Sequence, residues 1–187
     1  MLSKACQSLN FFHYLIAIAV IISGCSSVNS ENLSLSNKSD YAQLKPKSVY
    51  DGDTFRVIKD GQEIKIRMAC IDAPEKKQEL GIASRDYLRS LLNKNPNKLI
   101  VIKRGIDRFG RTIAEVFIPT GNGDEELPVN GMMIKSGMAH FYSQFARNCS
   151  DNADQYARLE KEAQRSRLGI WKNPNAMSPS EFRRKNR

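Results

Sequence analysis

An Asp-Gly dipeptide at residues 60–61 most constrains how this chain can fold. It lies between the segments 54–59 (TFRVIK) and 62–72 (QEIKIRMACID), both of which are rich in apolar and β-branched residues. Asp-Gly favours two-residue hairpin turns, because both central positions of such a turn need a positive φ. The sequence therefore predicts an antiparallel hairpin in which residue i faces the residue numbered roughly 121 minus i.

Apolar patterning predicts the remaining elements of one domain. Short apolar runs bounded by turn residues indicate strands, and apolar residues at helical spacing indicate helices. They predict strands at 99–104 (LIVIKR) and 112–119 (TIAEVFIP), and helices at 78–94, 129–137 and 152–168. With one more strand ahead of the hairpin, the natural closed arrangement is an α+β fold. We expect a five-stranded OB-fold (Greek-key) β-barrel with about three packed α-helices.

Length and charge narrow the class of protein. The 187 residues, of which 41% are hydrophobic, can bury one core of ordinary domain size. The formal net charge is +9, and +8 remains beyond the first 24 residues, which contain Lys4 and no acidic residue. A surplus of this size is typical of proteins with a polyanionic partner, either nucleic acid or an anionic membrane. Charge alone does not decide between the two.

The N-terminus is typical of an export signal. Lys4 precedes the apolar run 11–22 (FFHYLIAIAVII), which as a helix would be about 18 Å long and too short for the ~30 Å hydrocarbon layer of a membrane. The stretch IISGCSS resembles the bacterial lipoprotein signal, in which cleavage after residues 1–24 leaves Cys25 to be acylated. We therefore expect an exported protein that is lipid-anchored to a bacterial membrane, on its periplasmic face or at the cell surface. An ordinary secretory signal with an incidental cysteine is the alternative.

Composition divides the rest of the chain into a tether, a domain and a tail. Residues 25–40 are rich in Ser and Asn and predict a flexible tether. The folded domain is expected over 41–175, followed by a basic C-terminal tail over 176–187. Cys70 and Cys149 are the two cysteines of the domain, and in an oxidising compartment they predict either a disulfide bond or two separate buried thiols. Without a Cys-x-x-Cys motif, and with one histidine in the domain, zinc is not expected.

Charged residues gather where the predicted strands begin or end. Asp53 opens the first hairpin strand in the motif DGDT, and the hairpin register places it opposite Arg67 or Met68. Asp72 and Glu75 follow the second strand, in IRMACIDAPE. A turn with the sequence DRFGR brings a further arginine, at position 111, to the start of the next strand. Polar residues at strand ends would gather on one face of a small barrel.

These motifs resemble those of the staphylococcal nuclease (thermonuclease) homologues. DGDT, IRMACIDAPE, DRFGR and the closing LEKEAQRSRLGIW occur in the order and spacing of that family, over residues 41 to about 175. The resemblance implies an OB-fold and a calcium-dependent phosphodiesterase that hydrolyses DNA and RNA. It also implies cleavage of the 5′ P–O bond, which leaves 3′-phosphate ends. We expect the protein to act as a monomer.

The resemblance also implies a calcium site. Asp53 and Asp72 match the two calcium-binding carboxylates of the family, and the carbonyl oxygen of Ala73 falls where the family uses a backbone ligand. Hard oxygen ligands, completed by water, suit Ca²⁺. The ion would be the cofactor of the reaction.

Three further residues match the catalytic positions of the family. Arg67 and Arg111 match two arginines that stabilise the negative charge of the transition state. Their planar guanidinium groups can each bridge two phosphate oxygens, whereas lysine offers a point charge. Glu75 matches the candidate general base, which positions or deprotonates the attacking water.

The chain departs from the family where the type member has tyrosines that contact the terminal phosphate and the base. The matching positions hold Phe109, Ser143 and Phe145, so that stacking on a base is retained but phenolic hydrogen bonds are not. Tyr142 is adjacent and is equally suited to packing in the barrel. With Arg108 of the DRFGR turn, Phe109, Tyr142 and Phe145 are the candidate substrate-binding residues.

Two other classes of function fit parts of the pattern. One is a non-catalytic nucleic-acid-binding OB-fold module anchored to a membrane, and the other is a structural lipoprotein whose basic face binds anionic lipid or wall polymer. The presence of all five charged residues that match the nuclease motifs favours the enzyme over both.

Overall fold

The computed structural model describes residues 40–186. The expected signal peptide (1–24), the candidate lipidation site Cys25 and nearly all of the expected tether (25–40) therefore lie outside the described residues. Across the described part of the chain, no helix combines the length and the apolar character that crossing a membrane requires. The described residues cluster as one compact unit.

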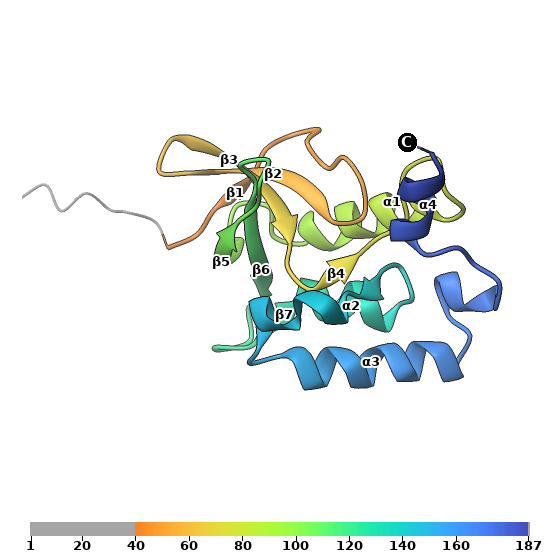
Figure 1. The fold of residues 1–187 in the computed structure, drawn as a ribbon. Coiled ribbons are helices and arrows are strands. Elements are labelled where there is room, and N and C mark those ends of the chain that lie inside the picture. Colours follow the sequence, from red (N-terminus) through yellow and green to blue (C-terminus); the bar gives the residue numbers. More distant parts are fainter. Residues whose placement is uncertain (1–39, 187) are drawn as a thin grey trace, which may run out of the picture. The chain divides into compact units, whose positions relative to one another are not determined.

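Six strands form one mixed sheet (Figure 1). They are β1 (Gln43–Leu44), β2 (Thr54–Lys59), β3 (Gln62–Met68), β5 (Ile100–Ile106), β6 (Thr112–Pro119) and β7 (Glu126–Pro128). Their order is β1-β2-β3-β6-β5, with β7 beside β6. β3 and β6 are parallel, and the other pairs are antiparallel.

The hairpin of β2 and β3 has the register that its turn predicts. Thr54 pairs with Arg67, and the pairing continues to the turn. Asp60 and Gly61 have φ values of 51° and 74°, as a turn of this kind requires. The predicted hairpin is therefore confirmed, and with it the position of Arg67 beside the start of β2.

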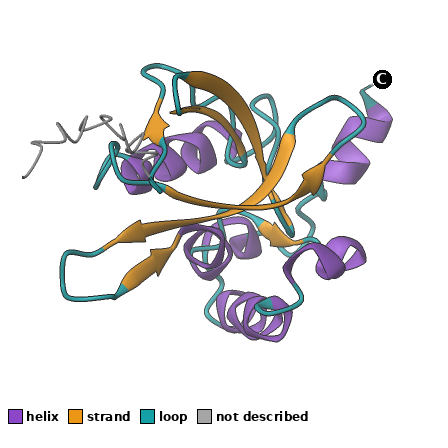
Figure 2. Ribbon diagram, turned by 90° about the vertical axis from the view of Figure 1, so that its left-hand side faces the viewer, coloured by secondary structure: helices purple, strands orange, loops and turns teal. Residues whose placement is uncertain are grey.

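The prediction of an α+β fold is confirmed, but the sheet does not close through a continuous ladder in the described residues. Its two ends are connected by one isolated bridge, in which Ala42 and Leu99 exchange backbone hydrogen bonds of 2.8 and 2.9 Å. Figure 2 shows the long strands strongly bent, with helices packed outside them. The sheet therefore curls toward closure and has a short pairing at the seam.

Helices cover the curled sheet. They are α1 (Gly81–Leu92), α2 (Val129–Lys135), α3 (Ala153–Arg165) and α4 (Pro179–Lys185), with 3₁₀ segments η1 (Ser143–Cys149) and η2 (Gly169–Lys172). The first three match the predicted helices, although α1 begins later than predicted because Leu80 has a left-handed backbone with φ of 62°. α4 lies in the segment that was expected to be a tail. Ser178 and Glu181 cap its start in a capping box, with Pro179 in the first turn.

The core fills the space between the curled sheet and α1 and α2. Its apolar side chains come from all of these elements, and each is nearly or fully inaccessible to solvent. Examples are Phe55, Val57, Ile66, Met68, Val116, Ile118, Leu88, Leu92, Met133 and Ile134. The strands are thereby fixed relative to one another, and the polar residues at their ends are fixed with them.

The strand predicted over residues 62–72 is broken, and in this respect the prediction is wrong. β3 ends at Met68, Cys70 has φ of 58°, and β4 (Ile71–Asp72) pairs with β8 (His140–Phe141) in a second, two-stranded sheet. Three long-range interactions hold the break. The side-chain amide of Asn130 donates to the carbonyl oxygen of Ala69 (2.9 Å), the amide of Tyr142 donates to that of Cys70 (2.8 Å), and a disulfide bond joins Cys70 to Cys149.

We predict that reduction of this disulfide lowers the free energy of unfolding measurably, by up to about 4 kcal/mol, because the bond restrains a long loop of the unfolded chain. Cys70 and Cys149 are 79 residues apart in the sequence, and their Cα atoms are 6.3 Å apart. Urea denaturation of the oxidised and reduced forms of a protein lacking Cys25 would measure the difference. Equal midpoints, or two free thiols per chain in the unfolded and unreduced protein, would contradict the prediction.

Candidate active site

The DGDT loop places the carboxylate of Asp53 within hydrogen-bonding distance of the segment that follows β4. A Cβ atom on Gly52 would lie 1.9 Å from Oγ of Ser84 and 2.7 Å from Cβ of Ala73, so that only glycine allows this close approach. The amide of Ala73 donates to Oδ2 of Asp53 (2.8 Å). The hydroxyl of Thr54 donates to Oδ1 of the same carboxylate (3.1 Å). The carboxylate of Asp53 is thus held by both hairpin and loop.

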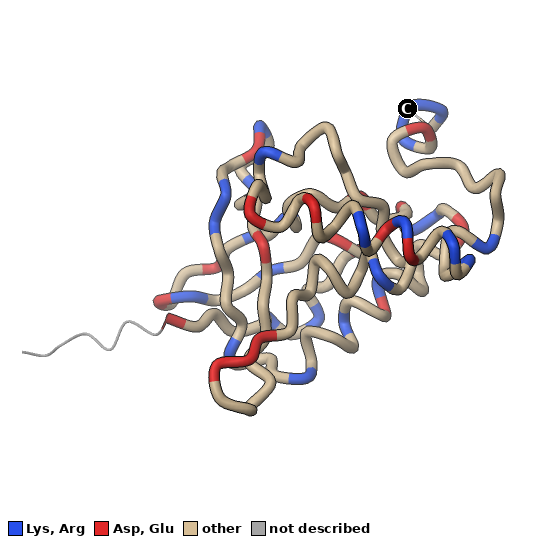
Figure 3. Tube along the Cα trace, turned by 90° about the horizontal axis from the view of Figure 1, so that it is seen from below, with Lys and Arg blue, Asp and Glu red and all other residues tan. Residues whose placement is uncertain are grey.

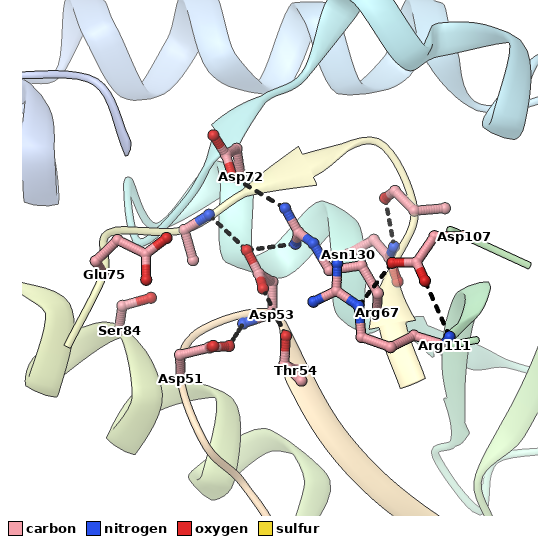
Figure 4. Close-up of polar contacts among 12 residues, drawn as sticks. Asp51, Asp53, Thr54, Arg67, Asp72, Glu75, Ser84, Asp107, Arg111 and Asn130 are labelled. Carbon is pink, nitrogen blue, oxygen red and sulfur yellow. Dashed lines mark hydrogen bonds and ion pairs between the residues drawn. The ribbon is translucent and has the colours of Figure 1, made fainter. Parts of the chain in front are cut away.

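Arg67 lies between two buried carboxylates (Figure 4). Its Nη2 donates to Oδ1 of Asp72 (2.9 Å), and its Nη1 forms an ion pair with Oδ2 of Asp53. Burial alone would favour loss of the proton, but the charges of Asp53 and Asp72 outweigh it and raise the pKa of Arg67. The register of the hairpin and the break at Cys70 bring these three residues together.

Burial disfavours the charged forms of the carboxylates near Arg67. Burial, followed by the charge of Asp53, raises the pKa of Asp51 to about 7. Burial also raises the pKa of Asp72, although the hydrogen bonds from Arg183 and the charge of Arg67 oppose this effect. An environment of this kind favours the binding of cations.

The side chain of Arg111 extends toward Asp53 and Arg67 from the turn between β5 and β6. Oδ1 of Asp107 accepts hydrogen bonds from the amides of Phe109 and Arg111, each of 2.9 Å, and its Oδ2 accepts one from Nε of Arg111 (2.6 Å). Although burial opposes it, these hydrogen bonds lower the pKa of Asp107. Figure 4 shows the guanidinium of Arg111 directed toward Asp53 and Arg67. Asp107 therefore orients an arginine whose two Nη groups face the site.

A cavity of about 730 Å³ opens beside the two arginines. The candidate substrate-binding residues lie on its wall, and the structure brings them together with Arg67 and Arg111. They are Arg108, Phe109, Tyr142 and Phe145. Phe109 is 68% exposed, and the ring centroids of Tyr142 and Phe145 lie 4.8 Å apart. The cavity therefore offers aromatic faces next to cationic groups, the combination that binds single-stranded nucleic acid.

Glu75 lies apart from the two arginines that match catalytic positions. Figure 4 shows Glu75 and Arg111 at opposite ends of the polar group, with Asp53 and Arg67 between them. The side chain of Glu75 is about one-third exposed, and its backbone amide donates a hydrogen bond to Oε1 of Gln78 (3.2 Å). It lies on the loop that follows β4 rather than on a strand.

The sequence did not point to the residue that contacts Glu75. Arg183 of α4 donates to Oδ1 and Oδ2 of Asp72 (3.0 and 2.9 Å) and to Oε1 of Glu75 (2.9 Å). The Ser-Pro-x-Glu sequence at 178–181 is a visible signal for a helix start, but nothing in the sequence indicates where this helix packs.

Asn130 and Asp107 were missed as well. Asn130 holds the break after Met68, because its side chain both donates to Ala69 and accepts from the amide of Val116 (2.9 Å). Asp107 lies inside the DRFGR motif, but the local sequence does not show that its side chain orients Arg111. The local sequence also gives no sign of the role of Asn130.

The donor groups at the site suit a hard cation. Among residues 40–186, no three His, Cys, Asp or Glu side chains converge as a metal-binding group. Asp53 and Asp72 nevertheless contact the same guanidinium, and Ala73 lies beside both, next to Asp72 in the chain and hydrogen-bonded to Asp53. Two buried carboxylates, a nearby carbonyl and water are a donor set that fits Ca²⁺. Asp72 can supply its oxygens only when Arg183 does not hold them.

Comparison with known proteins gives a consistent result. Residues 65–173 match the sequence model of the staphylococcal nuclease homologue family. The chain is 36% identical over 139 residues to the micrococcal nuclease of Shigella flexneri, a match that covers 73% of this chain and 77% of that protein. It is 34% identical over 137 residues to an uncharacterized endonuclease of Haemophilus influenzae (73% and 70% covered). It is 31% identical over 150 residues to the thermonuclease of Staphylococcus hyicus (77% and 82%). The chain therefore belongs to the staphylococcal nuclease homologue family and is a nuclease of the thermonuclease and micrococcal nuclease type.

Proposed function

We propose that the protein is a calcium-dependent phosphodiesterase that hydrolyses both DNA and RNA and leaves 3′-phosphate ends. The observation that carries the proposal is the position of Arg67, which is fixed between Asp53 and Asp72 at the wall of the 730 Å³ cavity. Two carboxylates that could bind a cation are thus held next to a guanidinium group that could bind phosphate.

Phosphodiester hydrolysis makes demands that these residues meet. Negative charge accumulates on the phosphate oxygens as water attacks in line, so that fixed positive donors lower the barrier. Arg67 and Arg111 provide two such donors on the same cavity. Each planar guanidinium can bridge two phosphate oxygens. Glu75 is the candidate base, which accepts a proton from the attacking water.

The donor set of Asp53, Asp72 and the carbonyl of Ala73 would hold the calcium ion. When bound, the ion would supply Lewis-acid stabilisation of the charge that develops on the phosphate. Asp53 is already aligned by Thr54 and by the amide of Ala73 (3.1 and 2.8 Å), so that little rearrangement of this ligand is needed.

The cavity is also suited to nucleic acids that contain either deoxyribose or ribose. Phe109 and Phe145 are exposed aromatic rings on its wall, and Arg108 stacks on Phe109 with 4.8 Å between the guanidinium carbon and the ring centre. Base stacking of this kind tolerates any sequence. The cavity is arranged to bind phosphate and bases, and a nuclease that does not read the 2′-hydroxyl accepts both DNA and RNA.

Family membership supports the OB-fold barrel as the plan of the domain, with the Ala42–Leu99 bridge at its seam. We further propose that the protein is exported and anchored through acylated Cys25, and that it acts as a monomer. The lipoprotein-like sequence around Cys25 supports the location.

Calcium should be required for cleavage of both nucleic acids. Plasmid DNA and RNA are expected to be degraded in the presence of Ca²⁺, and EDTA should abolish both activities because the carboxylates alone cannot stabilise the phosphate charge. Gel electrophoresis of the products would follow the reaction. Undiminished cleavage in EDTA would refute the metal assignment, and absence of cleavage with Ca²⁺ would favour a binding module.

Glu75→Gln is expected to lower turnover at least ~100-fold, the usual effect of removing a general base. Stability should change little, because Glu75 is partly exposed and contacts Arg183 rather than the core. Glu125→Gln, at an exposed acid between β6 and β7, is the matched control. Initial rates and thermal melts of both variants would test the assignment, and a near-normal rate for Glu75→Gln would reject it.

Arg67 requires a gentler substitution than alanine. Arg67→Ala would remove the guanidinium from the wall of the cavity. However, Arg67 balances two buried carboxylates, and removing one partner from a buried ionic group typically destabilises a protein by about 3–5 kcal/mol. We therefore expect Arg67→Lys to stay folded and to lose ~100-fold in turnover, since lysine cannot bridge two oxygens. A normal rate in a folded Arg67→Lys protein would contradict the role.

The products should carry 3′-phosphate ends, as the family resemblance implies. Treatment of the products with a 3′-phosphatase should then create primers that a polymerase extends, whereas untreated products should not be extended. Extension without the phosphatase would show 3′-hydroxyl ends and overturn the proposed bond.

A further inference from the structure

The C-terminal helix α4 places a guanidinium on the two carboxylates that the reaction needs. Arg183 binds both oxygens of Asp72 and one oxygen of Glu75, at 2.9–3.0 Å. α4 spans Pro179–Lys185, whereas the match to the family ends at residue 173. The contact is therefore made by a part of the chain beyond the family match.

This contact is incompatible with a cation at the same site. Oδ1 of Asp72 already accepts from Arg67, and with Arg183 the carboxylate accepts three hydrogen bonds from two guanidinium groups. A cation brought to Asp72 in this state would be repelled by both positive charges and would find no free oxygen. The same guanidinium occupies Oε1 of Glu75, the candidate base.

We propose that Arg183 makes an autoinhibitory contact, in which α4 closes the site until a divalent cation displaces it from Asp72. The inference rests on the proposed calcium-dependent nuclease function. The contact would hold the enzyme inactive wherever free calcium is scarce and would release Asp72 and Glu75 together.

The packing of α4 suits a helix that can leave. Within α4, Pro179 alone is buried, and the Arg183 side chain is partly exposed. A cavity of about 550 Å³ lies between α4 and the Glu75 loop, with Phe182 and Asn186 on one side and Lys76 and Lys77 on the other. With little apolar burial, the contact depends on its ion pairs, and segments of this kind open at low cost.

Like charges limit the strength of the contact. Arg184 and Lys185 follow Arg183 in the last turn of α4, which appears as the basic segment at the end marked C in Figure 3. Lys76 and Lys77 line the facing wall of the cavity. Repulsion between these groups opposes docking and is balanced by the pairing of Arg183 with Asp72 and Glu75.

Displacement of α4 would also enlarge the substrate cavity. Ser180 and Arg183 belong to the wall of the 730 Å³ cavity that holds Arg67 and Arg111. Outside the helix itself, Nε2 of Gln78 donates to the carbonyl oxygen of Met177, and the side chain of Asn173 lies 3.5 Å from that of Glu79. These contacts would keep the linker near the site while α4 moves.

Calcium affinity tests the proposal directly. If only those molecules in which Arg183 is released can bind calcium, the apparent dissociation constant equals the intrinsic constant divided by their fraction. Isothermal titration of the full chain in detergent should show that Arg183→Ala binds Ca²⁺ about 10-fold more tightly than the wild type, with Arg183→Lys between them. Arg184→Ala, which removes the adjacent charge of the same helix, should bind as the wild type does. Unchanged or weaker binding by Arg183→Ala would overturn the inference.

The position of α4 gives a second measurement that does not depend on catalysis. Trypsin cleaves after arginine and lysine, and mass spectrometry can follow cleavage after Arg184 and Lys185, which both proteins contain. Calcium should accelerate this cleavage in the wild type and should have little effect in Arg183→Ala, whose helix is already released. Equal rates with and without calcium in the wild type would contradict the contact. If neither protein binds calcium, the proposed function fails and the inference fails with it, whereas equal binding by both rejects the inference alone.

Discussion

The break in the chain at Ala69 and Cys70 is the constraint on which the site depends. In an unbroken strand, residues five apart lie roughly 16 Å apart and on opposite faces of the sheet. Arg67 and Asp72 would then never meet, yet they form a 2.9 Å hydrogen bond. The left-handed backbone of Cys70 turns the chain so that β4 leaves the main sheet and returns Asp72 to the arginine.

The same break explains what could and could not be predicted from the sequence. The hairpin register follows from a local turn, so that the position of Arg67 opposite Thr54 was predictable. The break depends on Asn130 and Cys149, which are far away in the sequence and give no local signal, while the residues around Cys70 look like one apolar strand. The motifs indicated which residues form the site, but the geometry that joins them is a tertiary effect.

Electrostatics links the buried residues of the site. Asp53, Arg67 and Asp72 are largely buried, and the positive charge of Arg67 offsets the negative charges of both carboxylates. Residues of this kind serve folding and catalysis together, so their substitution affects both. Arg111 and Glu75 are more exposed, and their charges can change without exposing a buried ion. Kinetics of variants at these outer positions therefore report on chemistry more cleanly.

The remaining side of the site is formed by segments with little buried surface. Glu75 lies on a loop, and Arg183 comes from a helix whose docking is chiefly electrostatic. A positive side chain on a cluster of carboxylates lowers the energy of the closed protein, because the cluster is otherwise short of positive charge. The charge distribution that would favour a cation at the proposed calcium site therefore also attracts the protein's own arginine. If calcium binds Asp72 as proposed, the ion and Arg183 exclude each other, so that one carboxylate would couple the position of α4 to the state of the site.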